Sequence, residues 1–269
     1  DLQLRFERPD TGSHFVKPIH PYATDLDIFG NHSLYRLLNR TRTAEGSRRL
    51  ADWLLTVPGL ETSLMRQEAV GEAATRPDWG QAWEAEALRY SLAAQQVDAL
   101  RVWVQQPLPE DLQAGLRWRW LGLGTLLLTV AWLLGGLPGW PVALALLGHG
   151  LLLRRYQELV QTTTSQTYTL GQTLAAYAAL LKRLEDVPFQ ARWWKEQRQA
   201  AHNAPAAVAT LARWFARLDY RHNVFFAFLV GIPSFWDLHC LAALEDWKQR
   251  HKDLLPLWLD TLAETEALN

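Results

Sequence analysis

Apolar residues along most of this chain recur at steps of three and four positions, which is the spacing of one face of an α-helix. No stretch alternates apolar and polar residues for long enough to predict a sheet. Good helix formers occupy nearly all of these segments. The pattern therefore predicts an all-α fold, a helical bundle with long helices and one apolar helical hairpin.

Four consecutive regions follow from the places where this pattern starts, changes or stops. Residues 1–30 are punctuated by proline and glycine and are expected to form an irregular leader. Residues 31–116 are expected to form the N-terminal helical part of a core, and residues 117–155 an apolar hairpin. Residues 156–269 are expected to contain long helices and the C-terminal part of the core.

The apolar hairpin is the strongest physical signal in the sequence. From Trp120 to Leu153 there is no Asp, Glu, Lys or Arg. The run is split into two arms at Gly135, Gly136, Pro138, Gly139 and Pro141. Each arm is shorter than the ~20 residues that a bilayer crossing prefers. A membrane hairpin here is therefore expected to be thin, extended by its flanks or only partly inserted.

The charges that flank the hairpin predict its orientation. Arg117 and Arg119 precede it, and Arg154 and Arg155 follow it. Positive charge at both ends places both ends on the cytoplasmic side. We therefore expect contact with the cytoplasmic face of the inner membrane through residues 120–153. The alternative is a hairpin buried in a soluble cytoplasmic bundle, but buried helices usually show a polar stripe, and its absence favours the membrane.

Two long apolar seams predict rod-like helices after the hairpin. One runs from Leu153 to Leu184 and ends before Pro188, which corresponds to a helix of roughly 45–50 Å. The other runs from Cys240 to Leu262. Stiff helices of this length are lever-like, because they convey displacement between distant parts of a protein.

Composition narrows the chemistry that the chain can perform. Lys and Arg total 27 against 28 Asp and Glu, so no global positive field draws the chain onto DNA. The single cysteine, Cys240, excludes an intramolecular disulfide and suits a reducing compartment. The histidines lack metal-site spacing, and no G-x-x-x-x-G-K-[ST] loop is present to hold a nucleotide. We therefore expect no catalytic residue, metal site or cofactor site in this chain.

A basic cluster around the first helices is the main candidate for contact with a ligand. It consists of Arg36, Arg40, Arg42, Arg48 and Arg49. These side chains are candidates to meet DNA phosphates or the acidic face of a partner. The competing interpretation is an ordinary solvated helix surface.

The run from Asp25 to Leu55 resembles the opening of the core domain in MutS proteins. In that family a short apolar helix leads into a T-x-T turn, a glycine and an R-x-L-x-x-W-L helix. The corresponding residues are Ser33, Leu34, Leu38, Asn39, Thr41, Thr43, Gly46, Arg49, Leu50, Trp53 and Leu54. Arg66 and Gln67 begin a segment that resembles the R-Q-x-A-V motif found at the family's spacing.

Later segments are similar to a MutS-related subgroup that carries membrane segments. They run from Arg217 to Asn223 and from Phe235 to Lys248, and their motif residues are Asp219, Asn223, Trp236 and Asp237. In that subgroup an ATPase domain starts shortly after an E-A-L segment, which here is Glu266–Leu268. The resemblance therefore predicts an ATPase domain after Asn269.

The resemblance implies the non-catalytic core and lever region of a MutS-like DNA mismatch repair ATPase. Such a region couples the ATP state of the downstream ATPase domain of the same chain to the binding of DNA or a partner. ATP and Mg²⁺, as well as a homodimer, are implied for the full-length parent. The family's mismatch-reading and clamp domains have no counterpart in this sequence. The alternative is a membrane-anchored helical interaction module unrelated to DNA repair, in which the basic cluster docks a partner.

Overall fold

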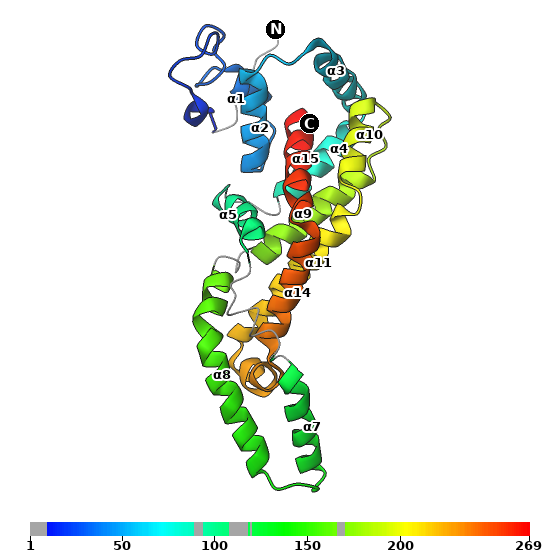
Figure 1. Cartoon of the computed structure of the whole chain (residues 1–269). Coiled ribbons are helices and arrows are strands. Elements are labelled where there is room, and N and C mark those ends of the chain that lie inside the picture. The colour runs from blue at the N-terminus through cyan, green and yellow to red at the C-terminus, as the bar shows by residue number, and fades with distance from the viewer. Residues whose placement is uncertain (1–9, 89–93, 108–117, 119, 166–169) are drawn as a thin grey trace. The chain divides into compact units, whose positions relative to one another are not determined.

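The computed structural model describes residues 10–88, 94–107, 118, 120–165 and 170–269 (Figure 1). Every regular element among these residues is helical, so the all-α prediction is confirmed for this part of the chain. The chain divides into two compact units, each built from distant parts of the sequence. Unit 1 comprises Asp1–Val97, Ala176–Ala207 and Asp253–Asn269, and unit 2 comprises Asp98–Ala175 and Val208–Lys252.

From residue 10 to Ser33 the described part of unit 1 is irregular apart from one short 3₁₀ turn, η1 (Ser13–Phe15). Its helices are α1 (Leu34–Leu38), α2 (Ala44–Leu55), α3 (Leu60–Ala74), α4 (Pro77–Leu88), α10 (Arg192–Ala200) and α15 (Leu254–Leu268). Three further helices contribute residues to both units, namely α5 (Ala94–Gln105), α9 (Leu170–Glu185) and α11 (Ala204–Leu218).

The core of unit 1 has two parts. Helix α2 packs along α15 in the most extensive helix pair of the described residues, with Leu50 and Ala51 buried. An aromatic cluster joins α4 and α10, where the ring centroids of Trp79 and Trp194 lie 5.3 Å apart. The indole of Trp194 also donates to the carbonyl of Ala69 at 3.1 Å, which satisfies its buried N–H.

Unit 2 contains the two arms of the apolar hairpin, α7 (Leu121–Leu133) and α8 (Trp140–Ser165), which contact each other (Figure 1). Its other elements are η3 (Asp219–His222), α12 (Val224–Phe226), the π-helical η4 (Ala227–Gly231), α13 (Ile232–Ser234) and α14 (Trp236–His251). Within the described residues, no helix combines the length and the apolar character that a bilayer crossing requires.

The second of the two long seams does not fold as the single rod expected, and the first is described only in part. Of the first, α8 ends at Ser165 and α9 begins at Leu170, and residues 166–169 between them lie outside the described part of the chain. The second is wrong as one helix, because α14 ends at His251 and α15 starts at Leu254. Pro256 explains the break, since it has no N–H to donate to the carbonyl of Lys252 and its ring would collide with that carbonyl.

Candidate functional site

A buried carboxylate from α15 holds the turn that precedes α2. Glu266 is 4% exposed and accepts hydrogen bonds from the backbone amides of Arg42 and Thr43, the latter at 3.0 Å. The hydroxyl of Thr43 also donates to this carboxylate. Three donors of one turn therefore bind a single side chain of the C-terminal helix.

The contact of Glu266 with Arg42 and Thr43 is called the junction from here on. It explains why threonine and glycine occupy positions 43 and 46. The hydroxyl oxygen of Thr43 accepts from the amide of Gly46 at 3.0 Å, so Thr43 is the N-cap of α2. A Cβ built on Gly46 would collide with the carboxylate of Glu266. Threonine and glycine at this spacing thus cap the helix and leave room for the acidic side chain.

Opposing effects act on the charge of Glu266. Burial raises its pKa, and the neighbouring carboxylate of Glu45 raises it further. The hydrogen bonds from Thr43 and from the amide of Arg42 lower it, but the net direction is upward. Glu45 is itself buried and accepts from the hydroxyl of Tyr177 at 3.3 Å. Two buried acidic side chains, Glu45 of α2 and Glu266 of α15, therefore lie beside the first turn of α2.

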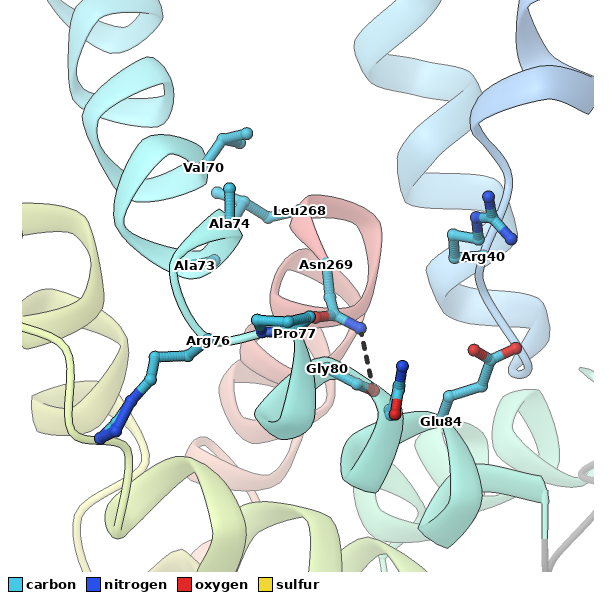
Figure 2. Close-up of a pocket in the computed structure, with 11 residues that line it drawn as sticks. Arg40, Val70, Ala73, Ala74, Arg76, Pro77, Gly80, Glu84, Leu268 and Asn269 are labelled. Atoms are coloured by element: carbon cyan, nitrogen blue, oxygen red, sulfur yellow. Dashed lines mark hydrogen bonds between the residues drawn. The ribbon is translucent and has the colours of Figure 1, made fainter. Parts of the chain in front are cut away.

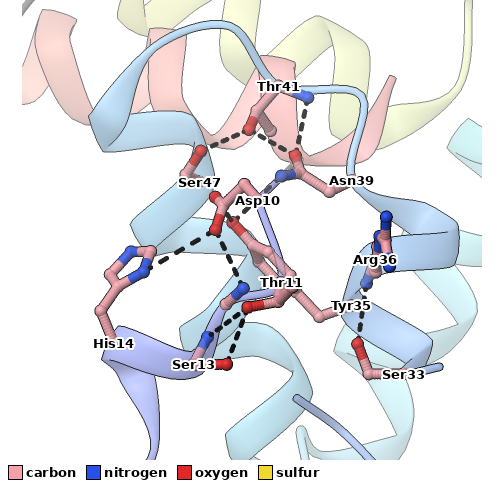
Figure 3. A network of polar contacts seen from close by, with 11 residues as sticks. Asp10, Thr11, Ser13, His14, Ser33, Tyr35, Arg36, Asn39, Thr41 and Ser47 are labelled. Atoms are coloured by element: carbon pink, nitrogen blue, oxygen red, sulfur yellow. Dashed lines mark hydrogen bonds and ion pairs between the residues drawn. The ribbon is translucent and has the colours of Figure 1, made fainter. Parts of the chain in front are cut away.

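A second network binds the residues around the T-x-T turn to the leader (Figure 3). The side-chain Nδ2 of Asn39 donates to the hydroxyl of Tyr35 at 3.1 Å, and that hydroxyl donates to Asp10 at 3.0 Å. The side-chain Oδ1 of Asn39 accepts from the hydroxyl of Thr41 at 2.6 Å, and this hydroxyl lies 2.7 Å from that of Ser47. Asn39 and Thr41 therefore position the turn, and burial raises the pKa of Tyr35, which keeps its phenol protonated.

The five arginines of the basic cluster do not share one environment. Arg42 pairs with Glu84, and Arg49 pairs with Asp260 at 3.3 Å and Glu264 at 3.6 Å. Arg40 and Arg48 are exposed. Arg36 is half-buried and donates to the carbonyl of Asn31 at 2.8 Å. The structure thus engages Arg42 and Arg49 in ion pairs within unit 1 and brings the cluster together only in part.

A shallow pocket of about 410 Å³ lies beside Arg40 in unit 1 (Figure 2). Its polar lining combines Arg40 and Arg76 with Glu84, and Asn269 crosses it to donate to the carbonyl of Gly80 at 3.5 Å. Both signs of charge therefore line this pocket, and its acidic residue, Glu84, is paired with Arg42.

The remaining motif residues of unit 1 have structural positions. The guanidinium of Arg66 lies 3.7 Å from the ring centroid of Trp53, which is a cation–π contact between α3 and α2. Leu50 is buried, whereas Leu38 and Gln67 are exposed. The R-Q-x-A-V and W-L segments are therefore brought together through Arg66 and Trp53.

Two motif residues of unit 2, Asn223 and Trp236, form hydrogen bonds with backbone groups. The side-chain oxygen of Asn223 accepts from the amide of Phe226 at 3.1 Å, and the indole of Trp236 donates to the carbonyl of Arg217 at 2.9 Å. Asp219 begins η3, and Asp237 lies in the first turn of α14. Further along α14 the motif includes a buried ion pair of 2.7 Å, formed by Glu245 and Lys248.

Sequence reasoning missed the central member of the junction. Glu266 was noted only as part of an E-A-L segment, and Asp260 and Glu264 are acidic residues of the same helix. No local pattern therefore distinguishes the buried carboxylate from its acidic neighbours. Tyr35, Asp10 and Ser47 were missed as well. The bond from Tyr35 to Asp10 spans 25 positions, whereas Ser47 lies only six positions after Thr41.

The described residues contain no group of His, Cys, Asp and Glu side chains arranged to hold a metal ion. Comparisons with protein-family models, with curated proteins and with solved structures find no match to this chain.

Proposed function

We propose that this chain is the non-catalytic helical core of a MutS-like DNA repair ATPase. In this proposal α15 relays the nucleotide state of an ATPase domain that follows Asn269 to the T-x-T turn and α2. The observation that carries the proposal is the binding of Glu266, in the last turn of α15, by the donors of Arg42 and Thr43.

The relay depends on the cost of breaking that junction. Moving α15 away from α2 would leave buried amides and a carboxylate without partners, at about 1–3 kcal/mol for each unsatisfied group. The turn before α2 must therefore move with Glu266 or release it in a discrete step. A contact with two such arrangements is suited to a switch.

Two further parts of the proposal concern the membrane and the ligand that the protein contacts. The hairpin of α7 and α8 tethers the chain to the cytoplasmic face of a membrane. The exposed arginines of the basic cluster, Arg40 and Arg48, contact DNA phosphates or an acidic partner. ATP, Mg²⁺ and dimerisation belong to the full-length parent.

Three measurements test this proposal. The first is the sequence of the parent protein beyond Asn269, the second is the ATP turnover of residues 1–269 alone, and the third is ATP hydrolysis by variants of the parent. We expect a Walker-type loop within a hundred or so residues after Asn269, and no ATP turnover by residues 1–269. In the parent, Glu266→Ala should keep basal ATP hydrolysis and lose its stimulation by DNA, whereas Glu266→Gln should retain most of the stimulation. Turnover by residues 1–269, or full stimulation in Glu266→Ala, would overturn the proposal.

A second candidate is a membrane-anchored helical interaction module unrelated to DNA repair. The exposed apolar side chains of α7 and α8 favour it, because they supply an anchor whether or not an ATPase follows. Under this proposal, no nucleotide-binding loop follows Asn269, and exposed arginines such as Arg40 and Arg48 dock an acidic partner. A Walker-type loop in the parent would exclude it.

A further inference from the structure

A second uncharged run lies in unit 2, apart from the hairpin in sequence. From Asn223 to Trp236 there is no Asp, Glu, Lys or Arg. The run folds as three short pieces, α12, η4 and α13, and the backbone then turns at Phe235, whose φ is 53°. Such a broken apolar segment offers no single helix to a partner.

This run packs directly on the base of the hairpin. Helix α13 contacts both α7 and α8. A Cβ on Gly122 would lie 2.9 Å from the carbonyl carbon and oxygen of Ser234, so only glycine allows this close approach. The ring of His149 in α8 lies 4.1 Å from that of Phe235, centroid to centroid. Residues 120–153 and 223–236 therefore form one apolar body.

The apolar body exposes large hydrophobic side chains. Leu127 is 69% exposed, Leu134 81% and Phe225 80%, and Trp140, Leu147 and Leu151 are exposed as well. Helix α7 carries apolar or small residues on all of its faces. A groove in a protein partner covers one stripe of a helix, whereas lipid surrounds it, so the pattern fits lipid.

Length and charge specify how the body meets lipid. Helix α7 has 13 residues, or about 20 Å, which falls short of the ~30 Å hydrocarbon core. The flanking arginines at 117, 119, 154 and 155 in the sequence are complementary to the phosphates of anionic lipids.

We propose that residues 223–236 enter one leaflet of an anionic bilayer together with the α7–α8 hairpin, as a single wedge that does not cross the membrane. This inference rests on the tether in the proposed function and not on its ATPase coupling. It adds a second inserting segment and sets the depth of insertion.

Single-cysteine labelling with an environment-sensitive dye tests the wedge in the full chain. The substitutions are Phe225→Cys and Leu134→Cys in the wedge. Val57→Cys in unit 1 is the exposed apolar control, because the native Val57 is 79% exposed. Native Cys240 can remain, because burial raises the pKa of its thiol to about 12 and blocks labelling. Unlabelled native protein treated with dye checks this.

The labelled proteins are mixed with vesicles of phosphatidylcholine and phosphatidylglycerol. We expect blue-shifted emission and quenching by spin-labelled lipid at residues 225 and 134, and emission unchanged from buffer at residue 57. Iodide trapped inside the vesicles should not quench the dye at residue 134. Quenching by trapped iodide would show a crossing hairpin and overturn the single-leaflet wedge.

The other outcomes separate this inference from the proposal on which it rests. A dye that stays in water at residue 225 while the dye at residue 134 inserts would overturn the second segment and keep the tether. Water-exposed dyes at both positions would overturn the wedge and the tether together. Neither result would test the proposed coupling between Glu266 and α2.

Discussion

The carboxylate of Glu266 meets Gly46 so closely that one added methyl group tests the junction. Gly46→Ala should lower the free energy of unfolding by about 1–3 kcal/mol, because the new Cβ collides with a side chain held by three donors. Gly71→Ala in α3 is the matched control, since its Cβ meets no atom within 4 Å. There alanine should be neutral or stabilising by up to about 1 kcal/mol. Urea denaturation measures both, and equal effects would refute the collision.

The raised pKa of Glu266 predicts how stability depends on pH. A carboxyl group that is easier to protonate when folded stabilises the fold fully below its unfolded pKa, and this contribution is lost as pH rises through the folded pKa. The free energy of unfolding should therefore fall as pH rises above about 4.5, the ordinary value. Glu266→Gln should flatten this part of the profile. An identical slope in the native and variant proteins would contradict the upward direction.

At the scale of elements, the hairpin is held by a polar contact between its two arms. The hydroxyl of Thr125 in α7 lies 3.0 Å from the ring nitrogen Nε2 of His149 in α8, and both residues are buried. Thr125→Val should cost about 1–3 kcal/mol, because it leaves a buried ring nitrogen unsatisfied. Thr129→Val is the control, since that hydroxyl bonds only the carbonyl of Thr125 among the described contacts. Thermal unfolding of the two variants should differ by several degrees, and coinciding transitions would count against the contact.

Apolar spacing predicted which segments are helical but not where each helix stops. The seam from Cys240 to Leu262 continues in sequence across the break between α14 and α15, because periodicity does not register a missing N–H. The break is instead signalled by Pro256, which cannot donate a hydrogen bond to the carbonyl of Lys252, four residues earlier. The short pieces between Val224 and Ser234 escaped prediction for a related reason, since none is long enough to show a helical period.

At the scale of the whole molecule, the sequence predicted the residue types of the candidate site better than its connections. Asn39, Thr41, Thr43 and Gly46 were identified through their motif. Asn39 bonds the nearby Tyr35, but the partner of Thr43 comes from the C-terminal helix. Pairing of Thr43 with Glu266 joins residues 223 positions apart, and no local pattern contains such a contact. The balanced charge of the chain also leaves any contact with DNA to individual arginines.

The central claim is that α15 transmits nucleotide state to α2, and amide hydrogen exchange in the parent protein tests it most directly. The amides of Arg42, Thr43 and Gly46 are the ones that the junction protects. The account predicts that their exchange differs between the ATP-analogue and ADP states, while the amide of Trp79 in α4 exchanges equally in both. Equal exchange at the junction in the two nucleotide states would contradict the account.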